Sequence, residues 1–324
     1  MRRAQRPLLA LASGALATLV LWAAPSSAQT WPTRPVKFVL PLGPGAGVDI
    51  GSRLFADRLS ARWGQPVVVE NKPGGDGVVA IGSFATARDD HVLLMSPTSS
   101  FTAHPFLKDN LPYKPSDLQP IARVSNTVVS IGVPVSLNIK SLDELFALVR
   151  AQPGKLNWAG VTGALDFLFE GYLKGAGLDM AKVPYRNPVE AANDLAEGRV
   201  QVYEAALAIV RPQVEAGKIK LLAVTNTVRA PAYPEIPTVK EAGYPALTID
   251  GLVGLFGPAD MPAALRERIA ADIRAAADPI IADRLNASGQ ILNIGGPAEF
   301  EKSIEEQRAE VAKMAKTLGV AARQ

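Results

Sequence analysis

The sequence predicts two α/β domains, each a mostly parallel sheet flanked by helices, which face each other across a cleft. Short apolar runs alternate with helical patterns along the chain, as they do in βαβ units. Two long apolar stretches, 121–135 and 247–256, separate a first set of these units from a second set. A chain that crosses to a second domain and then returns forms a clamshell, and ligands of such sheets bind outside the carboxyl ends of the strands.

The N-terminal segment has the pattern of a secretory signal. Arg2, Arg3 and Arg6 precede a mostly apolar run at 8–22, and residues 26–28 are small, as a signal peptidase requires. An uncleaved anchor helix would need roughly 20 apolar residues, and this run is shorter and is followed by Pro25. We therefore expect cleavage of residues 1–28 and a mature protein in the periplasm of a Gram-negative bacterium.

Charge and size limit the class of the mature chain. The whole chain has 34 basic and 31 acidic residues, and loss of the three signal arginines leaves 31 of each, so no basic footprint for nucleic acid is predicted. There is no cysteine, which excludes disulfides and a lipoprotein anchor. A mature chain of about 296 residues suits two domains better than one. We predict domain 1 at 29–130 plus 251–324 and domain 2 at 131–250, with crossings near 124–135 and 246–256.

Local patterns place the individual elements in order. The β-branched run 36–40 reads as a buried strand, and apolar residues recur at helical spacing over 49–63, ahead of Gly64 as a C-terminal cap. Ser141 and Glu144 form a capping box that opens a helix to residue 151. Further strands are predicted at 67–70, 92–96, 156–159, 182–185, 200–203 and 220–225, and further helices at 167–174, 189–197, 262–277, 280–288 and 297–318.

The loop 42–49 is the most informative stretch for binding. Its glycines free backbone N–H groups, and the following helix adds its positive N-terminal dipole, which suits a carboxylate or a phosphate. A tight turn with an aspartate near a helix start explains the same residues. The loop is neither a dinucleotide fingerprint nor a P-loop, because the required glycine and Lys-Ser/Thr are missing. The candidate ligand-binding residues of this loop are Leu42, Gly43, Gly45, Ala46, Gly47 and Asp49.

Two other loops follow predicted strands and carry hydroxyls or glycines. Residues 96–100 include Thr98 and Ser99, and the corresponding loop of the second domain is Gly160, Val161, Thr162 and Gly163. Both can present backbone amides and hydroxyls to an oxygen atom, although a plain polar loop is an equal interpretation. The run 73–77 is interpreted as a turn.

Catalytic and metal-binding signatures are missing from the sequence. His91 and His104 stand outside any His/Cys/Glu metal spacing, so we interpret both as structural. The mature chain has no G-x-S-x-G elbow and no cysteine nucleophile. Asp166 and Glu204 could pair in space, but on sequence alone they are interpreted as solvated surface positions.

Several short motifs resemble those of one family, the Bug receptors, which are the extracytoplasmic solute-binding proteins of tripartite tricarboxylate transporters. The similarity covers nearly the whole mature chain, in the family's order and spacing. The matching pieces are 31–35 (WPTRP), 39–49, 65–74 (QPVVVENKPG), 153–157 (PGKLN), 183–185 (VPY), 216–218 (AGK), 222–225 (LAVT), 237–243 (PTVKEAG) and 254–256 (GLF).

The resemblance implies a fold, a function and a site. The fold would be a two-domain periplasmic binding protein of the Venus-flytrap, type II-like kind. The protein would be a monomer that binds a small organic carboxylate without cofactor, metal or catalysis and delivers it to integral membrane subunits. One ligand carboxylate would be held by the loops 42–49, 98–99 and 160–163. A sensory protein that presents the same ligand to a signalling partner is the alternative.

The chain also departs from the family pattern in the second domain. The loop that usually ends in a Ser/Thr-Ser-His stretch here continues as 164–167, which includes Asp166. Where many members carry an aspartate after a strand, this chain has Glu204. We expect Asp166 and Glu204 to face the far end of the ligand and to disfavour a second carboxylate there.

Overall fold

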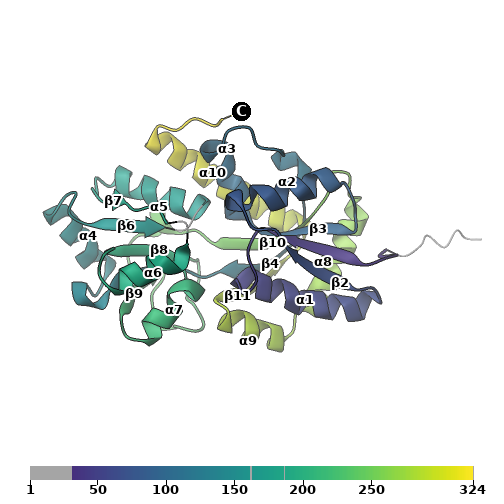
Figure 1. Ribbon diagram of the computed structural model, residues 1–324, viewed down its shortest axis with the longest axis horizontal. Coiled ribbons are helices and arrows are strands. Elements are labelled where there is room, and N and C mark those ends of the chain that lie inside the picture. The colour runs from purple at the N-terminus through teal and green to yellow at the C-terminus, as the bar shows by residue number, and fades with distance from the viewer. Residues whose placement is uncertain (1–30, 161–162, 186, 324) are drawn as a thin grey trace, which may run out of the picture.

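The computed structural model describes residues 31–160, 163–185 and 187–323. The predicted signal segment 1–28 and the predicted site residues Val161 and Thr162 lie outside these ranges. Within the described ranges, strands form a six-stranded sheet in the order β11-β4-β10-β3-β1-β2 and a five-stranded sheet in the order β7-β6-β8-β5-β9. The two sheets lie side by side along the long axis of the molecule, so the predicted two-part α/β architecture is confirmed (Figure 1).

The first lobe is the six-stranded sheet with the helices that cover it. Its strands are β1 (Val36–Leu40), β2 (Val67–Asn71), β3 (Val92–Pro97), β4 (Gln119–Thr127), β10 (Gly251–Gly257) and β11 (Gln290–Gly295). Its helices are α1 (Gly47–Trp63), α2 (Val78–Ala87), α3 (Thr98–Leu107), α8 (Ala263–Ala276) and α9 (Pro279–Ala287). Strand β1 pairs in parallel with β2 and β3, whereas β10 runs antiparallel to β3 and β4 and β11 runs antiparallel to β4. The sheet is therefore mixed and not mostly parallel as predicted, because the strands beside the crossings to the second lobe pair in antiparallel fashion.

The second lobe is the five-stranded sheet with its helices. Its strands are β5 (Val129–Pro134), β6 (Asn157–Gly160), β7 (Ala181–Lys182), β8 (Val202–Ala206) and β9 (Ile219–Val224). Its helices are α4 (Leu142–Ala151), α5 (Ala164–Gly175), α6 (Pro188–Ala196) and α7 (Leu207–Glu215). Strand β6 is parallel to β7 and β8, and β5 is antiparallel to β8 and β9. Short 3-10 turns lie at Gly75–Gly77, Pro115–Asp117, Val135–Leu137 and Pro245–Leu247.

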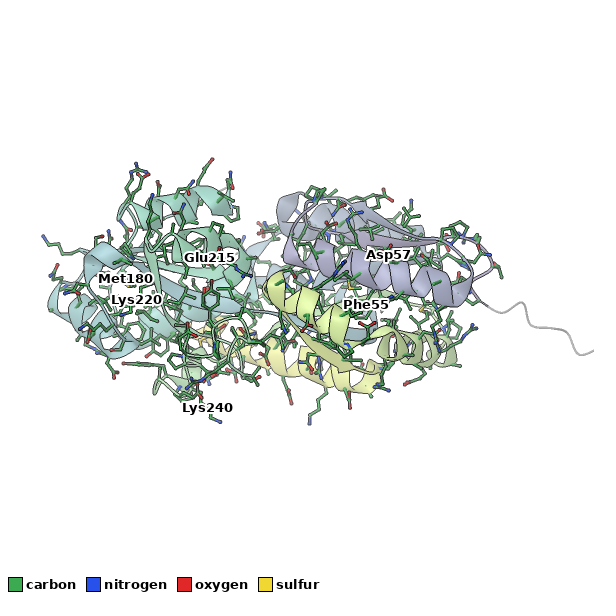
Figure 2. The ribbon with its side chains drawn as sticks, turned by 90° about the horizontal axis from the view of Figure 1, so that it is seen from below. Phe55, Asp57, Met180, Glu215, Lys220 and Lys240 are labelled. Atoms are coloured by element: carbon green, nitrogen blue, oxygen red, sulfur yellow. The ribbon has the colours of Figure 1, made fainter. Side chains whose placement is uncertain are left out.

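Apolar side chains fill both faces of each sheet. In the first lobe Phe55 and Leu59 of α1 are fully buried, whereas Asp57 on the same helix is exposed, which is the alternation that the helical spacing predicts (Figure 2). Ile50, which shares that spacing, is 36% exposed because it lies at the first turn of the helix. Helix α1 ends at Gly64, whose positive φ of 64° closes the helix as predicted.

The last helix, α10 (Pro297–Leu318), contacts both lobes. Phe300 and Ile304 pack with Phe256 in the first lobe. Val311 and Ala315, further along the helix, pack with the apolar face of α5 in the second lobe. The helix therefore connects the two lobes along one side of the molecule (Figure 1). The domain boundaries given above stay a prediction.

Several elements differ from the sequence prediction. Helices α2, α3 and α7 and strand β11 were not predicted, the strand at 182–185 is only Ala181–Lys182, and the strand at 200–203 is Val202–Ala206. Helix α3 begins with three hydroxyl residues and contains Pro105, which favour a loop, but burial of Phe101 and Ala103 stabilises it. Tertiary packing therefore overrides local preference in this segment.

Candidate functional site between the lobes

Four helices begin where strands end toward the space between the lobes. Helices α1, α3, α5 and α7 follow β1, β3, β6 and β8, and none of the four receives a side-chain cap from the described residues. Helices α4, α6 and α9 are capped by Ser141, Asn187 and Asp278, whereas α2, α8 and α10 also lack a side-chain cap, so the first four helices are set apart by where they begin. The first N–H groups of an uncapped helix have no partner in the helix, and the dipole makes this end positive. The first group of helix ends is therefore suited to an anion.

The glycine loop before α1 is organised by Asp49. Its buried carboxylate accepts hydrogen bonds from the Gly45 N–H at 2.9 Å and the Asn71 amide at 2.9 Å, and it pairs with Arg53 at 3.0 Å. Burial raises the pKa of Asp49, but the bonds from Arg53, Asn71 and Gly45 outweigh this effect and hold the pKa below its ordinary value. Asp49 is thus an ionised group that shapes the loop, and the N–H of Gly45 is already donated to it.

Other residues of this loop differ in how much space they face. A Cβ atom on Gly43 or Gly45 would meet nothing within 4 Å, so this part of the loop faces open space, and Gly45 has a φ of +84°. The Leu42 carbonyl accepts from Asn71 at 2.8 Å, and Ala46 is the N-cap of α1. A Cβ on Gly47 would lie 2.7 Å from the Ser288 carbonyl oxygen, so only glycine fits there.

The second predicted loop is the first turn of helix α3. The Thr98 hydroxyl donates to Gln307 of α10 at 2.6 Å, so it is held inside the protein. Ser99 is 7% exposed, and its carbonyl oxygen faces the second lobe. Thr98 therefore positions the start of α3, and Ser99 and its neighbours form the surface toward the cleft.

The two lobes touch where α3 and α5 begin. A Cβ atom on Gly163, the N-cap of α5, would lie 2.6 Å from the Ser99 carbonyl oxygen, and Gly163 has a φ of +84°. Phe106 of α3 stacks on Phe167 of α5 with ring centroids 6.0 Å apart. Ser99 and Gly163, which belong to loops that the sequence assigned to opposite walls of one cleft, are therefore brought together.

Asp166 and Glu204 lie in one buried cluster of the second lobe. Glu204 pairs with Gly160 in the sheet, and a Cβ on Gly160 would collide with the Asp166 Oδ1 atom. Glu204 is 1% exposed and the Asp166 side chain is 15% exposed. The interpretation of both as solvated surface positions is thus wrong, because strand β8 extends to Ala206 and includes Glu204.

Lys182 completes this cluster and was not singled out in the sequence. Its Nζ atom lies 2.5 Å from Asp166 and 2.7 Å from Glu170, and it stands 5.1 Å from the centre of the Trp158 ring. Burial lowers the pKa of Lys182, but Asp166 outweighs burial and the pKa is raised. Lys182 is separated from Asp166 by a helix and a turn, so no local spacing could reveal the pair.

The turn at 73–77 also belongs to the region between the lobes. A Cβ on Gly77 would lie 3.2 Å from Pro41 and 3.6 Å from Ser100, so this turn touches both first-lobe loops. Asp76 pairs with Lys108 at 3.2 Å and raises the pKa of Asp166 across the lobes. The three clustered glycines were the available signal for a functional loop.

The crossings between the lobes are joined by one buried amide. Asn226 accepts from the Val129 N–H at 3.0 Å and donates to the Thr127 carbonyl at 2.9 Å and to Asp250 at 3.3 Å. It therefore links the outgoing crossing at Val128 to the returning one at Asp250. Gln307 donates to the Asp250 carbonyl at 3.3 Å, so the same hinge is connected to α3.

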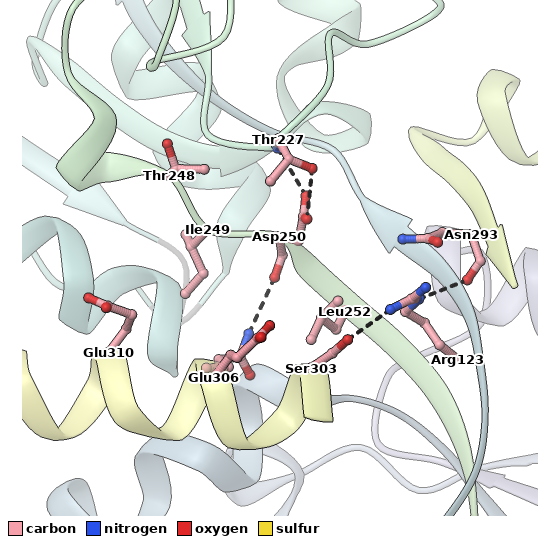
Figure 3. Close-up of a pocket in the computed structure, with 11 residues that line it drawn as sticks. Arg123, Thr227, Thr248, Ile249, Asp250, Leu252, Asn293, Ser303, Glu306 and Glu310 are labelled. Carbon is pink, nitrogen blue, oxygen red and sulfur yellow. Dashed lines mark hydrogen bonds between the residues drawn. The ribbon is translucent and has the colours of Figure 1, made fainter. Parts of the chain in front are cut away.

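A pocket of about 210 Å³ lies on the hinge, away from the predicted loops (Figure 3). Asp250 bonds Thr227, and Arg123 donates to Ser303 at 2.8 Å and to the Asn293 carbonyl at 3.2 Å. Arg123 and Asp250 are thus engaged with neutral polar neighbours, and none of the predicted site residues lines the pocket. We assign this pocket to the hinge and not to the ligand site.

The histidines take part in internal hydrogen bonds. His91 accepts from the Thr33 N–H at 3.1 Å and bonds Asp90 at 2.6 Å, while Asp89 pairs with Arg34 at 2.6 Å. The cluster Asp89, Asp90 and His91 has the residue types of a metal site, but each of its groups already has a protein partner. Burial lowers the pKa of His104 to about 4, so its ring is neutral near neutral pH.

No helix in the described part of the chain combines the length and the apolar character that crossing a membrane requires.

Two α/β lobes, two crossings and uncapped helix ends between the lobes define a solute receptor with the fold of periplasmic binding proteins. Residues 52–320 match the family described as tripartite tricarboxylate transporter family receptor. The chain belongs to this family, whose members are periplasmic solute-binding receptors and not enzymes.

Individual relatives support this assignment. The chain is 30% identical over 298 residues to a UPF0065 protein of Bordetella bronchiseptica, and the match covers 91% of this chain and 89% of that protein. Among solved structures, it is similar to an R. palustris protein with adipate, at 28% identity and a TM-score of 0.79, with coverage of 90% and 99%. It is also similar to the periplasmic binding protein BugD, at 26% identity and a TM-score of 0.75, with coverage of 91% and 100%.

Proposed function

We propose that this protein binds a small organic carboxylate between its lobes and delivers it to the membrane subunits of a tripartite tricarboxylate-type transporter. The mature protein would begin at residue 29 after cleavage of a Sec signal and act as a monomer in the periplasm of a Gram-negative bacterium. The observation that carries the proposal is the set of uncapped starts of α1, α3 and α5, which come from both lobes. The similarity to a protein solved with adipate supports a carboxylate as the ligand.

Closure of the lobes would couple binding to delivery. A ligand that contacts both lobes shifts an open–closed equilibrium by its differential affinity for the two states. The proposed division into residues 29–130 with 251–324 and residues 131–250 makes the crossings near Val128 and Asp250 the hinge. The membrane partner would recognise the closed form. Residues Val161 and Thr162 stay part of the proposed site, together with Gly160 and Gly163.

The ligand can be found with a thermal-shift screen of small mono- and dicarboxylates, followed by calorimetry. A ligand at 100 times its Kd stabilises the folded state by about 2.7 kcal/mol, which is readily measured. The proposal is refuted if a screen that covers aliphatic, hydroxy, amino and aromatic carboxylates gives no stabilisation.

A pair of variants tests the anion site itself. Gly45 faces open space at positive φ, and Asp and Asn both tolerate that conformation. Gly45→Asp places a carboxylate near the ligand carboxylate, and Gly45→Asn adds the same volume without charge. Two carboxylates at ~4 Å repel each other by about 1–4 kcal/mol. The Gly45→Asp variant should therefore bind the ligand about tenfold or more weakly than the Gly45→Asn variant. Equal affinities of the two folded variants would remove the loop 42–49 from the site.

Export and delivery have separate tests. N-terminal sequencing of the periplasmic form should begin at Gln29. Uptake of the identified ligand by cells should be lost when this chain or the membrane subunits are deleted. Intact uptake with a lost transcriptional response would instead assign the protein to ligand sensing.

A further inference from the structure

Glu204 and Asp166 carry two buried carboxyl oxygens that have no partner among the described residues. Oε2 of Glu204 and Oδ1 of Asp166 form no hydrogen bond with the described residues. Buried polar atoms are nearly always hydrogen-bonded in folded proteins, so each orphaned atom calls for an explanation. Both stand beside Gly160, three residues before Gly163, where the second lobe touches Ser99 of the first.

The two carboxyl groups differ in charge near neutral pH. Burial, followed by the nearby Asp166, raises the pKa of Glu204 well above its ordinary value. Glu204 is 1% exposed and has no salt-bridge partner among the described residues, and a carboxyl group buried in this way takes up a proton, so Glu204 offers one O–H donor. Burial raises the pKa of Asp166 to about 6 against the opposing effect of Lys182, so Asp166 is mostly ionised near neutrality. Its Oδ2 atom bonds Lys182, which leaves Oδ1 as a free acceptor.

This arrangement changes the sequence-based expectation that two anions repel the far end of the ligand. Only Asp166 carries a negative charge that can repel a second carboxylate, whereas Glu204 offers a donor and an acceptor. Lys182 Nζ lies 2.5 Å from Asp166, so a ligand ammonium at this position would meet a like charge nearby. A methyl group would leave both orphaned oxygens unsatisfied.

We propose that Asp166 and Glu204 select a ligand whose far end is a neutral hydrogen-bonding group, a hydroxyl or a carboxamide, in preference to a second carboxylate. This inference rests on the proposed function, because it assumes that the first carboxylate is held by the uncapped helix ends. A neutral group of this kind donates a hydrogen bond to Asp166 Oδ1 and accepts one from the protonated carboxyl of Glu204. The specificity of this receptor then differs from that of the relative solved with adipate.

Matched ligands test the proposal by calorimetry on the full mature chain. The probes are succinate, glutarate and adipate, with the half-amide, the ω-hydroxy acid, the ω-amino acid and the plain monocarboxylate of each length. At the length that binds best, the half-amide or hydroxy acid should bind about tenfold or more tightly than the dicarboxylate, because like charges at ~4 Å repel.

Variants assign the preference to particular residues. Asp166→Asn removes the charge and should bring the dicarboxylate to within about threefold of the half-amide, a loss of most of the tenfold preference. Glu204→Gln keeps a neutral donor and acceptor and should retain the preference, whereas Glu204→Leu should weaken the half-amide about tenfold. Glu170→Gln is the matched control. Glu170 also bonds Lys182, but its side chain is 41% exposed. This variant should leave the preference for the half-amide unchanged.

The outcomes separate this inference from the proposed function. Tightest binding of a dicarboxylate to the wild type, with the same order in Asp166→Asn, overturns the inference while the carboxylate receptor stands. A preference for the half-amide that Asp166→Asn and Glu204→Leu both leave intact also overturns it. If no carboxylate among these probes or those of the wider screen binds, the proposed function itself falls.

Discussion

The contact of Gly163 with Ser99 makes ligand affinity sensitive to a single methyl group. Gly163 has φ +84° and ψ −147°, a region that is essentially restricted to glycine, and a side chain there costs about 1–3 kcal/mol in strain. The added Cβ would also lie 2.6 Å from the Ser99 carbonyl oxygen and 2.9 Å from its carbon, in the opposite lobe. The backbone strain applies in every state of the protein, whereas the clash with Ser99 is relieved when the lobes separate.

Gly163→Ala should therefore weaken ligand binding more than it weakens folding. A penalty of about 1.4 kcal/mol on the closed state alone lowers the apparent affinity tenfold, because only the closed fraction holds ligand with both lobes. We expect a loss of about tenfold or more in calorimetry. Small-angle scattering of the unliganded variant should show a more open molecule than the wild type.

Gly177→Ala is the matched control for backbone strain. Gly177 lies in the same lobe at φ +63°, and its added Cβ would meet nothing within 4 Å. This variant should lose about 1 kcal/mol of stability in chemical denaturation and bind ligand normally. If Gly163→Ala lost stability to the same extent and kept wild-type affinity, the contact between the lobes would have no part in binding.

Four further outcomes follow from the hinge and from the buried acids. Asn226→Ala leaves the Val129 N–H and the Thr127 carbonyl without their partner, so the free energy of unfolding should fall by about 1–3 kcal/mol in urea denaturation. Gln307→Leu removes the acceptor of two buried hydroxyls, including that of Thr98, and should cost a similar amount while also weakening ligand binding. The preference for a half-amide should shrink between about pH 7.5 and about pH 5.5, because the pKa of Asp166 is raised to about 6 and its charge is lost on acidification. The free energy of unfolding should fall as the pH rises from the ordinary pKa of 3.8 to about 6, because the folded state keeps the Asp166 proton in this range and the unfolded state does not, and Asp166→Asn should remove this part of the pH profile. The charged or titratable groups around Asp166 are Asp76, Glu170, Lys182 and Glu204, so the profile should be compared with that of Glu170→Gln.

Much of the fold could be predicted because its elements have local signatures. The strand at 36–40, the helix at 297–318 and the capping box at Ser141 match the structure closely, since each depends on side chains within one or two turns. Helix α3 could not be predicted, because its hydroxyl-rich start and Pro105 resemble a loop until Phe101 is buried against Phe256. Strand β8 was placed too early for a related reason, since Glu204 looks unsuited to a buried strand.

The candidate site could also be predicted only in part. The loops at 42–49, 98–99 and 160–163 could be proposed as candidates because glycines and hydroxyls follow strands at the edge where ligands of such sheets bind. The hydrogen bonds inside these loops could not be predicted. The structure shows that Asp49 accepts from the Gly45 N–H and that the Thr98 hydroxyl donates to Gln307, so both side chains stabilise the fold.

The sequence alone determined the two α/β halves and the family and suggested the candidate anion-binding loops, because these follow from local periodicity and from motifs in a fixed order. Only the tertiary structure decided that α10 braces both lobes, that Gly163 meets Ser99, and that Lys182 pairs with Asp166 beside a buried Glu204. The physical reason is that burial and proximity set the charge of a carboxyl group. Residues 16 or more positions apart acquire that proximity only when the sheets and helices pack.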